Sequence, residues 1–200
     1  MASRIPPLSP KEWPKAMKAA LAALTPAHPR HPLPERRDDR PKGLNILGTL
    51  AHHPELATAY HTFNGHVLFG STLDLRTREV LVLRVAAVRG CEYEWLQHAV
   101  MAIDLGLTPS EIERIGEGPD AEELAPLDAA LVRAVDELLA DAEIGDATWT
   151  ALAAELDQRQ LMDLVFTVGA YDALAMAMQS FGIEIDDDLA AHADSVPPLP

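Results

Sequence analysis

The sequence predicts an all-helical protein, and three observations support that prediction. Two long segments, residues 76–89 and 157–181, are apolar on nearly every side of a helix, so both are expected to lie deep in the protein. Residues 106–111, with the sequence Gly-Leu-Thr-Pro-Ser-Glu, combine the signals that end one helix and cap the next. No stretch of useful length alternates apolar and polar residues as a half-buried strand does. Together these features predict a multi-helix bundle.

The chain has 200 residues, which suits one domain with a sizeable core. Prolines crowd residues 1–45, so this part is expected to be an arm, with one helix over about 12–24 and an irregular run over 25–42. Residues 46–183 are expected to form the helical domain. The tail over 184–200 is acidic and contains prolines, so we expect it to fray.

The charge balance limits the partners that the protein can have. There are 16 basic and 31 acidic residues, a net charge of -15, and no basic cluster, which argues against nucleic acid and anionic membranes. The single cysteine forbids an internal disulfide and suits a reducing compartment. The N-terminus lacks the apolar core of a signal peptide, and no apolar run is of transmembrane length. We therefore expect a soluble cytoplasmic protein with no membrane partner.

The region over 44–69 has helical periodicity and predicts a short helix followed by a longer one over 55–69. A turn over 70–75 follows, in which Ser71 or Thr72 is a candidate cap for the next helix. Four histidines lie in this region, and the last two are candidates to reach a functional site: His52, His53, His61 and His66.

Two helices that meet at Gly90 form the centre of the chain. The first spans about 76–89. The second begins near Cys91 and ends at Gly106, because glycine suits the position just after a helix. If the two helices pack as a hairpin, the residues on their facing sides come together.

The polar side chains of this hairpin fall on one face. Cys91, Glu94 and His98 are spaced i, i+3 and i+7, so they point the same way from the second helix. Glu79 lies on the first helix and can turn toward this row if the hairpin packs. A thiol, two carboxylates and an imidazole then converge inside an apolar wall.

Helices are also expected over four segments after the hairpin, of which the last is long and apolar: 109–115, 126–142, 146–156 and 157–181. Thr108 and Glu111 form the capping box of the first of these helices. Asp146 is the candidate cap of the third.

The central stretch resembles the carboxymuconolactone decarboxylase and alkylhydroperoxidase D family. The peroxidase branch of that family has a glutamate, a Cys-x-x-Cys that begins twelve positions later, and a histidine four residues further on. Glu79, Cys91 and His98 match that spacing, but Glu94 stands at the second cysteine position. The run over 93–98, Tyr-Glu-Trp-Leu-Gln-His, resembles the decarboxylase-like branch instead.

The resemblance is best over 76–107 and extends more weakly over about 45–183. It implies an all-helical, alkylhydroperoxidase D-like fold in a homotrimer or homohexamer, with the site near a subunit contact. The amount of apolar helix surface also favours an oligomer over a monomer.

The candidate catalytic residues are Glu79, Cys91, Glu94 and His98. Glu94 and His98 are an i, i+4 pair, which forms either a solvated surface ion pair or a semi-buried pair suited to proton transfer. Cys91 follows Gly90 at a helix start, where the helix dipole stabilises a thiolate. Nearby carboxylates oppose this by raising the pKa of the thiol, and a free cysteine is also commonly a small buried hydrophobe.

The candidate substrate contacts are Arg84, Tyr93 and Trp95. Arg84 interrupts an apolar helix, so it is either an anchor for an anionic substrate or a structural arginine paired with Glu92 or Glu94.

A metal site is a further reading of the polar row. Glu79, Glu94 and His98 could supply a carboxylate-rich ligand set, but the Glu-x-x-His repeat of di-iron bundles is missing. We therefore expect no metal and no other cofactor.

Three functions are consistent with the sequence. The first is a carboxymuconolactone decarboxylase-like enzyme that acts on a small-molecule substrate and uses Glu79, Glu94 and His98 for proton transfer. The second is a one-cysteine thiol peroxidase, in which a hydroperoxide oxidises Cys91 to a sulfenic acid and an external thiol reduces it. The third is a non-catalytic helical oligomer.

Overall fold

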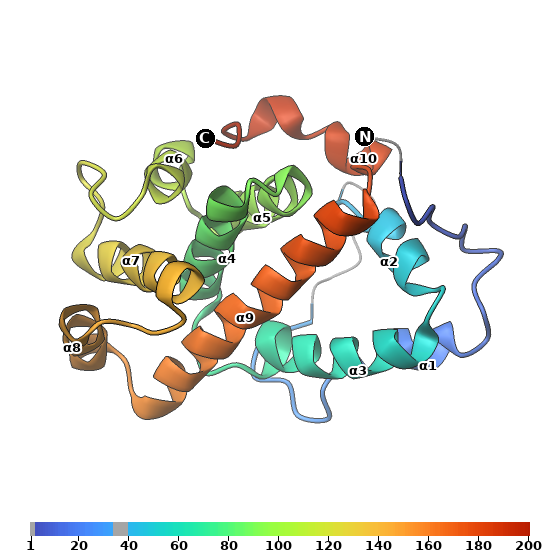
Figure 1. Ribbon diagram of the computed structural model, residues 1–200, viewed down its shortest axis with the longest axis horizontal. Helices are drawn as coiled ribbons and strands as arrows, with labels where there is room; N and C mark the ends of the chain where they lie inside the picture. The colour runs from blue at the N-terminus through green and yellow to red at the C-terminus, as the bar shows by residue number, and fades with distance from the viewer. Residues whose placement is uncertain (1–2, 34–39) are drawn as a thin grey trace. The chain divides into compact units, whose positions relative to one another are not determined.

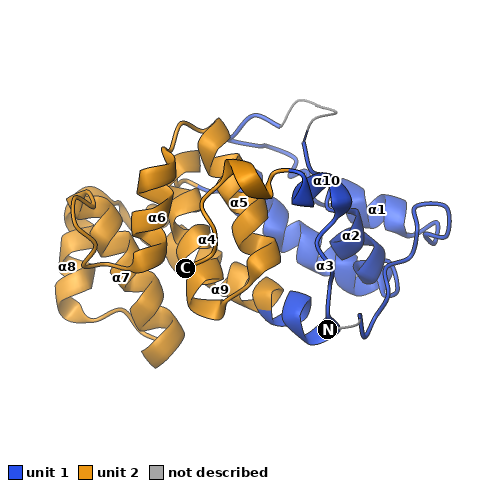
Figure 2. Cartoon of the chain, turned by 90° about the horizontal axis from the view of Figure 1, so that it is seen from above, with its two compact units in different colours: residues 1–71, 176–191 blue, residues 72–175, 192–200 orange. Residues whose placement is uncertain are grey.

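The computed structural model describes residues 3–33 and 40–200, and every regular element in these ranges is helical (Figure 1). The all-helical fold class predicted from the sequence is therefore confirmed. The chain divides into two compact units (Figure 2). Unit 1 comprises residues 1–71 and 176–191, and unit 2 comprises residues 72–175 and 192–200.

Unit 1 has a small apolar core between α1, Met17–Ala22, and α3, Pro54–Gly65. Its buried members are small or flexible side chains: Met17, Ala20, Ala51 and Ala57. The other elements of this unit are α2, Leu44–Leu50, the π-helical turn η1, His66–Gly70, and α10, Asp187–Ala190.

The first helix begins later than the sequence predicts. Glu12 Oε2 accepts a hydrogen bond from Ser9 N at 3.0 Å, as in a capping box, but Ser9 Oγ donates to the same carboxylate at 2.6 Å instead of accepting from Glu12 N. These bonds close a turn instead of starting a helix. Pro14 has no N–H and disfavours the helical conformation in the residue before it, so α1 starts only at Met17.

The N-terminal arm packs along the helices of unit 1, although the sequence predicts an irregular run over 25–42. The backbone N–H of Arg30 donates to Phe69 O at 2.6 Å. The backbone at Leu24 approaches Gly65 closely. A Cβ atom on residue 65 would lie 2.5 Å from Leu24 O. The part of the expected irregular run over 25–42 that the structure describes is therefore held by contacts, and the rest of that run lies outside the described residues.

Unit 2 contains most of the longer helices: α4, Leu75–Arg89; α5, Glu92–Asp104; α6, Pro109–Glu117; α7, Pro126–Asp141; α8, Asp146–Glu155; the first part of α9, Gln158–Phe181; and the 3-10 turn η2, Ala193–Ser195. Helix α4 packs against α5, α6 and α7 (Figure 1). Its residues from Val80 to Leu83 are fully buried, as expected for a helix that is apolar all round.

The caps of the unit 2 helices agree with the sequence at one position and differ at two. Thr108 and Glu111 form the predicted capping box of α6. Helix α4 is capped by Asp74, which accepts from Thr77 N at 2.7 Å, and not by Ser71 or Thr72.

Helix α8 also differs, because its cap position is Gly145 and the side chain of Asp146 makes no cap bond. Glu137 on α7 supplies the acceptor, since its Oε2 accepts from Gly145 N at 2.9 Å. A carboxylate from a neighbouring helix thus binds the residue that precedes α8.

The tail over 184–200 does not fray as expected. In unit 1, Asp186 Oδ1 accepts from Asn45 N at 2.9 Å. In unit 2, the indole Nε1–H of Trp95 donates to Pro197 O at 2.9 Å. Buried indole and backbone groups that find these partners hold the tail in place.

Helix α9 corrects the expectation that no apolar run is of transmembrane length. Among the described residues, α9 is the one helix long and apolar enough to cross a membrane. In its most apolar stretch of 18 residues, 44% is buried inside the protein. A core helix meets the same criteria, so this finding assigns neither a membrane nor a compartment.

Candidate functional site

The α4–α5 hairpin positions the candidate catalytic residues, and all of them lie in unit 2. Gly90 ends α4 in the left-handed conformation, with φ 61°, which a residue with a side chain rarely adopts. The N–H of Cys91 then donates to Ala86 O at 2.9 Å and closes the turn. This tight turn sets the start of α5 at Cys91 and brings the two helices side by side (Figure 1).

Three buried residues form a chain of charge-assisted hydrogen bonds across the hairpin. Arg78 donates from Nε at 2.9 Å and from Nη2 at 2.6 Å to Oε1 of Glu79. The other oxygen, Glu79 Oε2, lies 2.6 Å from His98 Nδ1. The structure therefore joins Glu79 and His98, which the sequence placed on facing helices, and adds Arg78.

The protonation of this chain follows from its geometry. Burial raises the pKa of the Glu79 carboxyl, but His98 and Arg78, which are both hydrogen-bonded to it, outweigh burial and lower the pKa below its usual value. An ionised carboxylate only accepts hydrogen bonds, so His98 Nδ1 carries the proton in the shared bond. That assignment leaves Nε2 as the nitrogen that can exchange a proton with another molecule.

Glu94 is the polar group that the site leaves unsatisfied. Its side chain is 1% exposed, and neither carboxyl oxygen has a hydrogen-bond partner among the described residues. Burial, and then the charge of Asp172, raise the pKa of Glu94 well above its usual value. This shift favours the neutral acid form of the carboxyl group. The expected i, i+4 pair with His98 is not formed, because His98 pairs with Glu79.

Cys91 is a buried thiol and is 2% exposed. Burial, and then the nearby Glu94, raise the pKa of the thiol to about 12. The amides of Glu94 and Tyr93 act in the opposite direction, but the balance still favours the neutral thiol. The helix dipole alone thus does not produce the thiolate that the sequence position suggested.

Helix α9 contributes two site residues that the sequence analysis missed. The ring of Tyr171 packs edge-on against His98, with the ring centroids 4.9 Å apart. Asp172 accepts from Arg89 Nε at 2.5 Å and also acts on Glu94 through its charge. A signal for them was present, because a tyrosine and an aspartate interrupt a long apolar helix.

Arg84 has a structural partner that the sequence did not identify. Its Nε donates to Asp136 Oδ1 at 2.6 Å and its Nη1 donates to Gly116 O at 2.6 Å. These bonds tie α4 to α6 and α7. The acidic partner is Asp136, and neither Glu92 nor Glu94 makes a hydrogen bond to this arginine among the described interactions.

The two aromatic candidates lie inside the protein. Tyr93 is 3% exposed and Trp95 is 2% exposed, and the indole of Trp95 is bonded to the tail. A role in contacting substrate would require this region to open.

The histidines of unit 1 have local roles. His61 is buried, and its Nδ1 lies 2.9 Å from Ala20 O, which links α3 to α1. The ring of His66 lies over Gly70, where a Cβ would be 2.9 Å from Nδ1. Within the described ranges, no group of three or more His, Cys, Asp and Glu side chains is placed to hold a metal ion.

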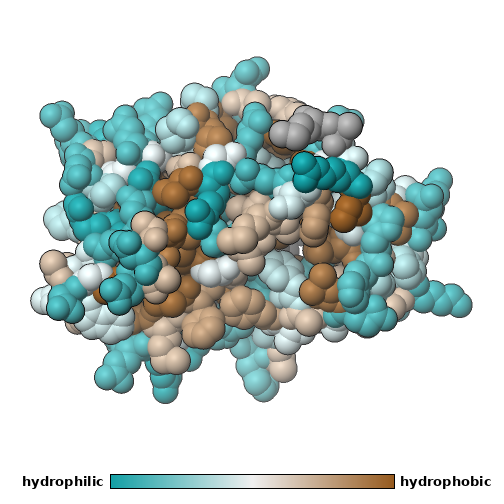
Figure 3. All heavy atoms as spheres, viewed as in Figure 1, coloured by the Kyte–Doolittle hydropathy of each residue, from teal (hydrophilic) through white to brown (hydrophobic). Residues whose placement is uncertain are grey.

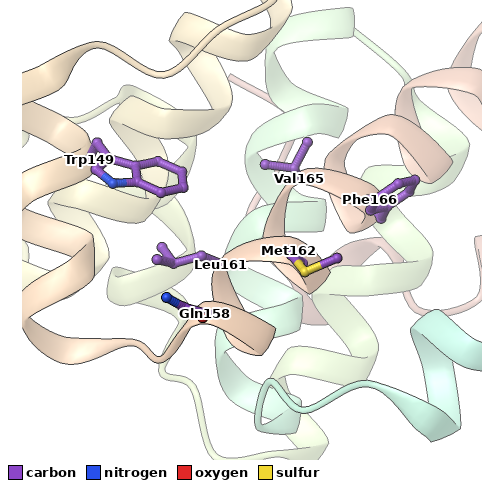
Figure 4. Close-up of a pocket in the computed structure, with 6 residues that line it drawn as sticks. All are labelled: Trp149, Gln158, Leu161, Met162, Val165 and Phe166. Carbon is purple, nitrogen blue, oxygen red and sulfur yellow. The ribbon is translucent and has the colours of Figure 1, made fainter.

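An apolar hollow of ≈ 460 Å³ lies elsewhere in unit 2, between α8 and α9. Trp149 extends from α8 toward α9, where Leu161 and Val165 lie on the facing side (Figure 4). Hydrophobic atoms also gather on the face over which α9 runs (Figure 3). The residues that line the hollow include none of the candidate catalytic residues, so the hollow is not the space in which Glu94 and His98 would act.

The fold is similar to that of alkylhydroperoxidase D-like helical proteins. Residues 54–137 match the sequence model of the carboxymuconolactone decarboxylase family, and this region includes the whole α4–α5 hairpin. The resemblance inferred from the sequence is therefore confirmed over these residues. No curated protein matches the sequence.

Solved structures with a similar fold extend the likeness to most of the chain. An alkylhydroperoxidase AhpD core protein from Ralstonia eutropha JMP134 is 20% identical with a TM-score of 0.65, covering 82% of this chain and 96% of that one. A peroxidase-related protein from Silicibacter sp. TM1040 is 18% identical with a TM-score of 0.65, covering 72% and 77%.

The debrominase Bmp8 is 12% identical with a TM-score of 0.72, covering 96% of this chain and 97% of that one. A cysteine-to-alanine variant of Bmp8 was solved in complex with 2,3,4-tribromopyrrole. At these identities the likeness shows the fold alone.

Proposed function

We propose that the protein is a small-molecule enzyme that moves protons with two buried groups, a neutral Glu94 acid and a His98 base. The observation that supports this most is Glu94, whose two buried carboxyl oxygens lack hydrogen-bond partners. A buried polar group left unpaired destabilises the fold by about 1–3 kcal/mol. Such a group is expected where a bound molecule supplies the missing partner.

The roles of the two groups follow from their protonation. The raised pKa of Glu94 favours a neutral acid that can donate a proton, while Nε2 of His98 can accept one because Nδ1 is held by Glu79. In a lactone, His98 would remove a proton from the carbon beside the carbonyl as Glu94 donates to the developing oxyanion. In a β-keto acid, loss of CO2 leaves a carbanion, and the proton from Glu94 quenches it.

The arginines favour a substrate whose reacting part is uncharged. Arg78, Arg84 and Arg89 are each bonded to a carboxylate of the protein, and these bonds engage the cationic groups that would otherwise anchor an anion. Of the two substrate classes, a lactone therefore fits this environment better than a β-keto acid, whose reacting group is a carboxylate.

A thiol peroxidase is the second candidate. Cys91 begins α5, the amides of Glu94 and Tyr93 lower the pKa of its thiol, and proteins of similar fold are described as peroxidase-related. Against this, the pKa remains at about 12, and Glu94 replaces the resolving cysteine of the peroxidase branch.

The test compares three variants on a panel of lactones and β-keto acids, with hydroperoxide plus an external dithiol run beside it. Glu94→Gln and His98→Ala are each expected to lower turnover by about 10²–10⁴-fold, the usual contribution of a general acid or base. Cys91→Ser should lower it far less, because the thiol is not the reacting atom. Glu92→Gln, which alters an exposed residue of the same helix, is the matched control.

Fast peroxide reduction that disappears in Cys91→Ser, with a sulfenic acid trapped at Cys91, would instead establish the peroxidase. Turnover on the panel that survives both Glu94→Gln and His98→Ala would show that the polar row is structural.

The expected partners also stay predictions. These are a small-molecule substrate, a homotrimer or homohexamer, no nucleic acid and no membrane, in a cytoplasmic protein. Sedimentation velocity at micromolar concentration tests the assembly, and a monomeric mass would contradict it.

A further inference from the structure

We propose that Arg78 is a positioning residue of the site: it holds Glu79 so that Glu79 fixes the proton on Nδ1 of His98 and frees Nε2 for chemistry. This inference rests on the proposed function in one respect, which is that the chemistry at Nε2 is proton transfer. The family spacing points to Glu79 and His98, whereas Arg78 comes from the geometry of this structure.

The geometry is specific for an arginine. Nε and Nη2 of Arg78 both reach Oε1 of Glu79, at 2.9 and 2.6 Å, so two N–H groups converge on one oxygen. Arg78 thereby holds Oε1, which leaves Oε2 to bond His98 Nδ1, 2.6 Å away. The single ammonium of a lysine carries the same charge but cannot make this planar, two-point contact.

Burial makes the charge of Arg78 matter. The side chains of Glu79, Arg78 and His98 are 0%, 6% and 8% exposed, so water screens their interaction weakly. With Arg78 present, the Glu79 carboxylate is neutralised and the imidazole can be neutral without leaving a net buried charge. Without Arg78, the same region is neutral only if the Glu79–His98 pair holds one more proton.

Other titratable groups lie near the Glu79–His98 pair. Tyr171 from α9 contacts the His98 ring and faces Arg78. Glu94 and Cys91 lie on α5 with His98, and Asp172 of α9 acts on Glu94 while bonded to Arg89. Of these groups, Arg78 is the one that is both cationic and bonded to Glu79.

The experiment follows the ring nitrogens of His98 by nitrogen-15 NMR as a function of pH, with the His98 signal identified by its loss in His98→Gln. The unaltered protein should show a proton on Nδ1 and none on Nε2 near neutral pH. In Arg78→Met, the pair should hold its additional proton to higher pH. An opposite charge at this range moves a pKa by about 1–3 units, so a shift of at least one unit is expected.

Arg78→Lys separates charge from geometry. Because the charge is kept, its titration midpoint should differ from that of the unaltered protein by less than half of the shift seen in Arg78→Met. Because the geometry is lost, the narrow Nδ1–H signal of a fixed hydrogen bond should disappear. Arg76→Met is the matched control on the same helix, because Arg76 pairs with Asp128 at 2.8 Å and not with Glu79. Tyr171→Phe controls for the tyrosine that faces the same guanidinium.

Two results would overturn the proposal. One is an unchanged His98 titration and tautomer in Arg78→Met. The other needs no variant to fold: a His98 ring that carries its proton on Nε2 in the unaltered protein. If the titration shifts as expected but no substrate is turned over, the proposed function fails and the role of Arg78 stands.

Discussion

Glu94 and His98 lie one turn apart on the same buried face of α5, yet the carboxyl group of Glu94 makes no hydrogen bond to the imidazole. His98 is bonded to Glu79 instead, at 2.6 Å. Glu79 thus engages Nδ1 of His98, whereas the raised pKa of Glu94 favours its neutral acid form. Pairs of titratable groups held apart in this way are typical of acid–base sites.

The first prediction concerns the reactivity of Cys91. With a thiol pKa of about 12, the thiolate fraction at pH 8 is roughly a thousandfold smaller than for an ordinary cysteine. Alkylation by iodoacetamide should therefore be slow in the folded protein and fast after unfolding in urea. Glu94→Gln should lower the midpoint of the alkylation rate against pH, because at the high pH where the thiol titrates Glu94 is ionised and its charge raises the thiol pKa. Rapid alkylation of the folded protein near pH 7 would contradict this account.

The second prediction links Glu94 to stability. The folded-state pKa of Glu94 is raised, so the group stabilises the fold at low pH. That contribution is lost as the pH rises from the usual carboxyl pKa of 4.5 through the folded-state pKa. Urea unfolding at a series of pH values should show Glu94→Gln gaining stability relative to the unaltered protein over this window. Glu79, whose folded pKa is lowered, is present in both proteins and cancels. A difference in free energy of unfolding that does not vary with pH would refute the assignment.

The third prediction concerns the C-terminal tail. Deleting residues 197–200 removes the acceptor of the buried Trp95 indole, and an unpaired buried donor costs about 1–3 kcal/mol. The same deletion in a Trp95→Phe background should cost less, because that ring has no donor to satisfy. Equal losses of unfolding free energy in the two backgrounds would show that the hydrogen bond does not hold the tail.

Local signals in the sequence were sufficient for the helical fold. The turn at Gly90 needs a left-handed residue, and the Thr108–Glu111 box satisfies backbone amides within its own first turn. Such features depend on neighbouring residues alone, so they can be recognised without the tertiary structure.

The placement of the candidate site's side chains was predicted in part. Glu79 and His98 were correctly placed on facing helices, but spacing alone could not decide which carboxylate pairs with the imidazole. Arg78, Tyr171 and Asp172 were missed because their roles arise from packing between helices distant in the sequence. The ordered tail was missed for the same reason, since its partner is the indole of Trp95.

The neutral carboxyl group of Glu94 is the central claim of this account, and infrared difference spectroscopy tests it most directly. Spectra of the unaltered protein minus Glu94→Gln, recorded at pH 7, should show the loss of the carbonyl band of a protonated carboxylic acid. The matching difference for Glu79→Gln should show the loss of carboxylate bands, because the pKa of Glu79 is lowered. Loss of carboxylate bands in Glu94→Gln would mean that Glu94 is ionised, and the proposed acid would not exist.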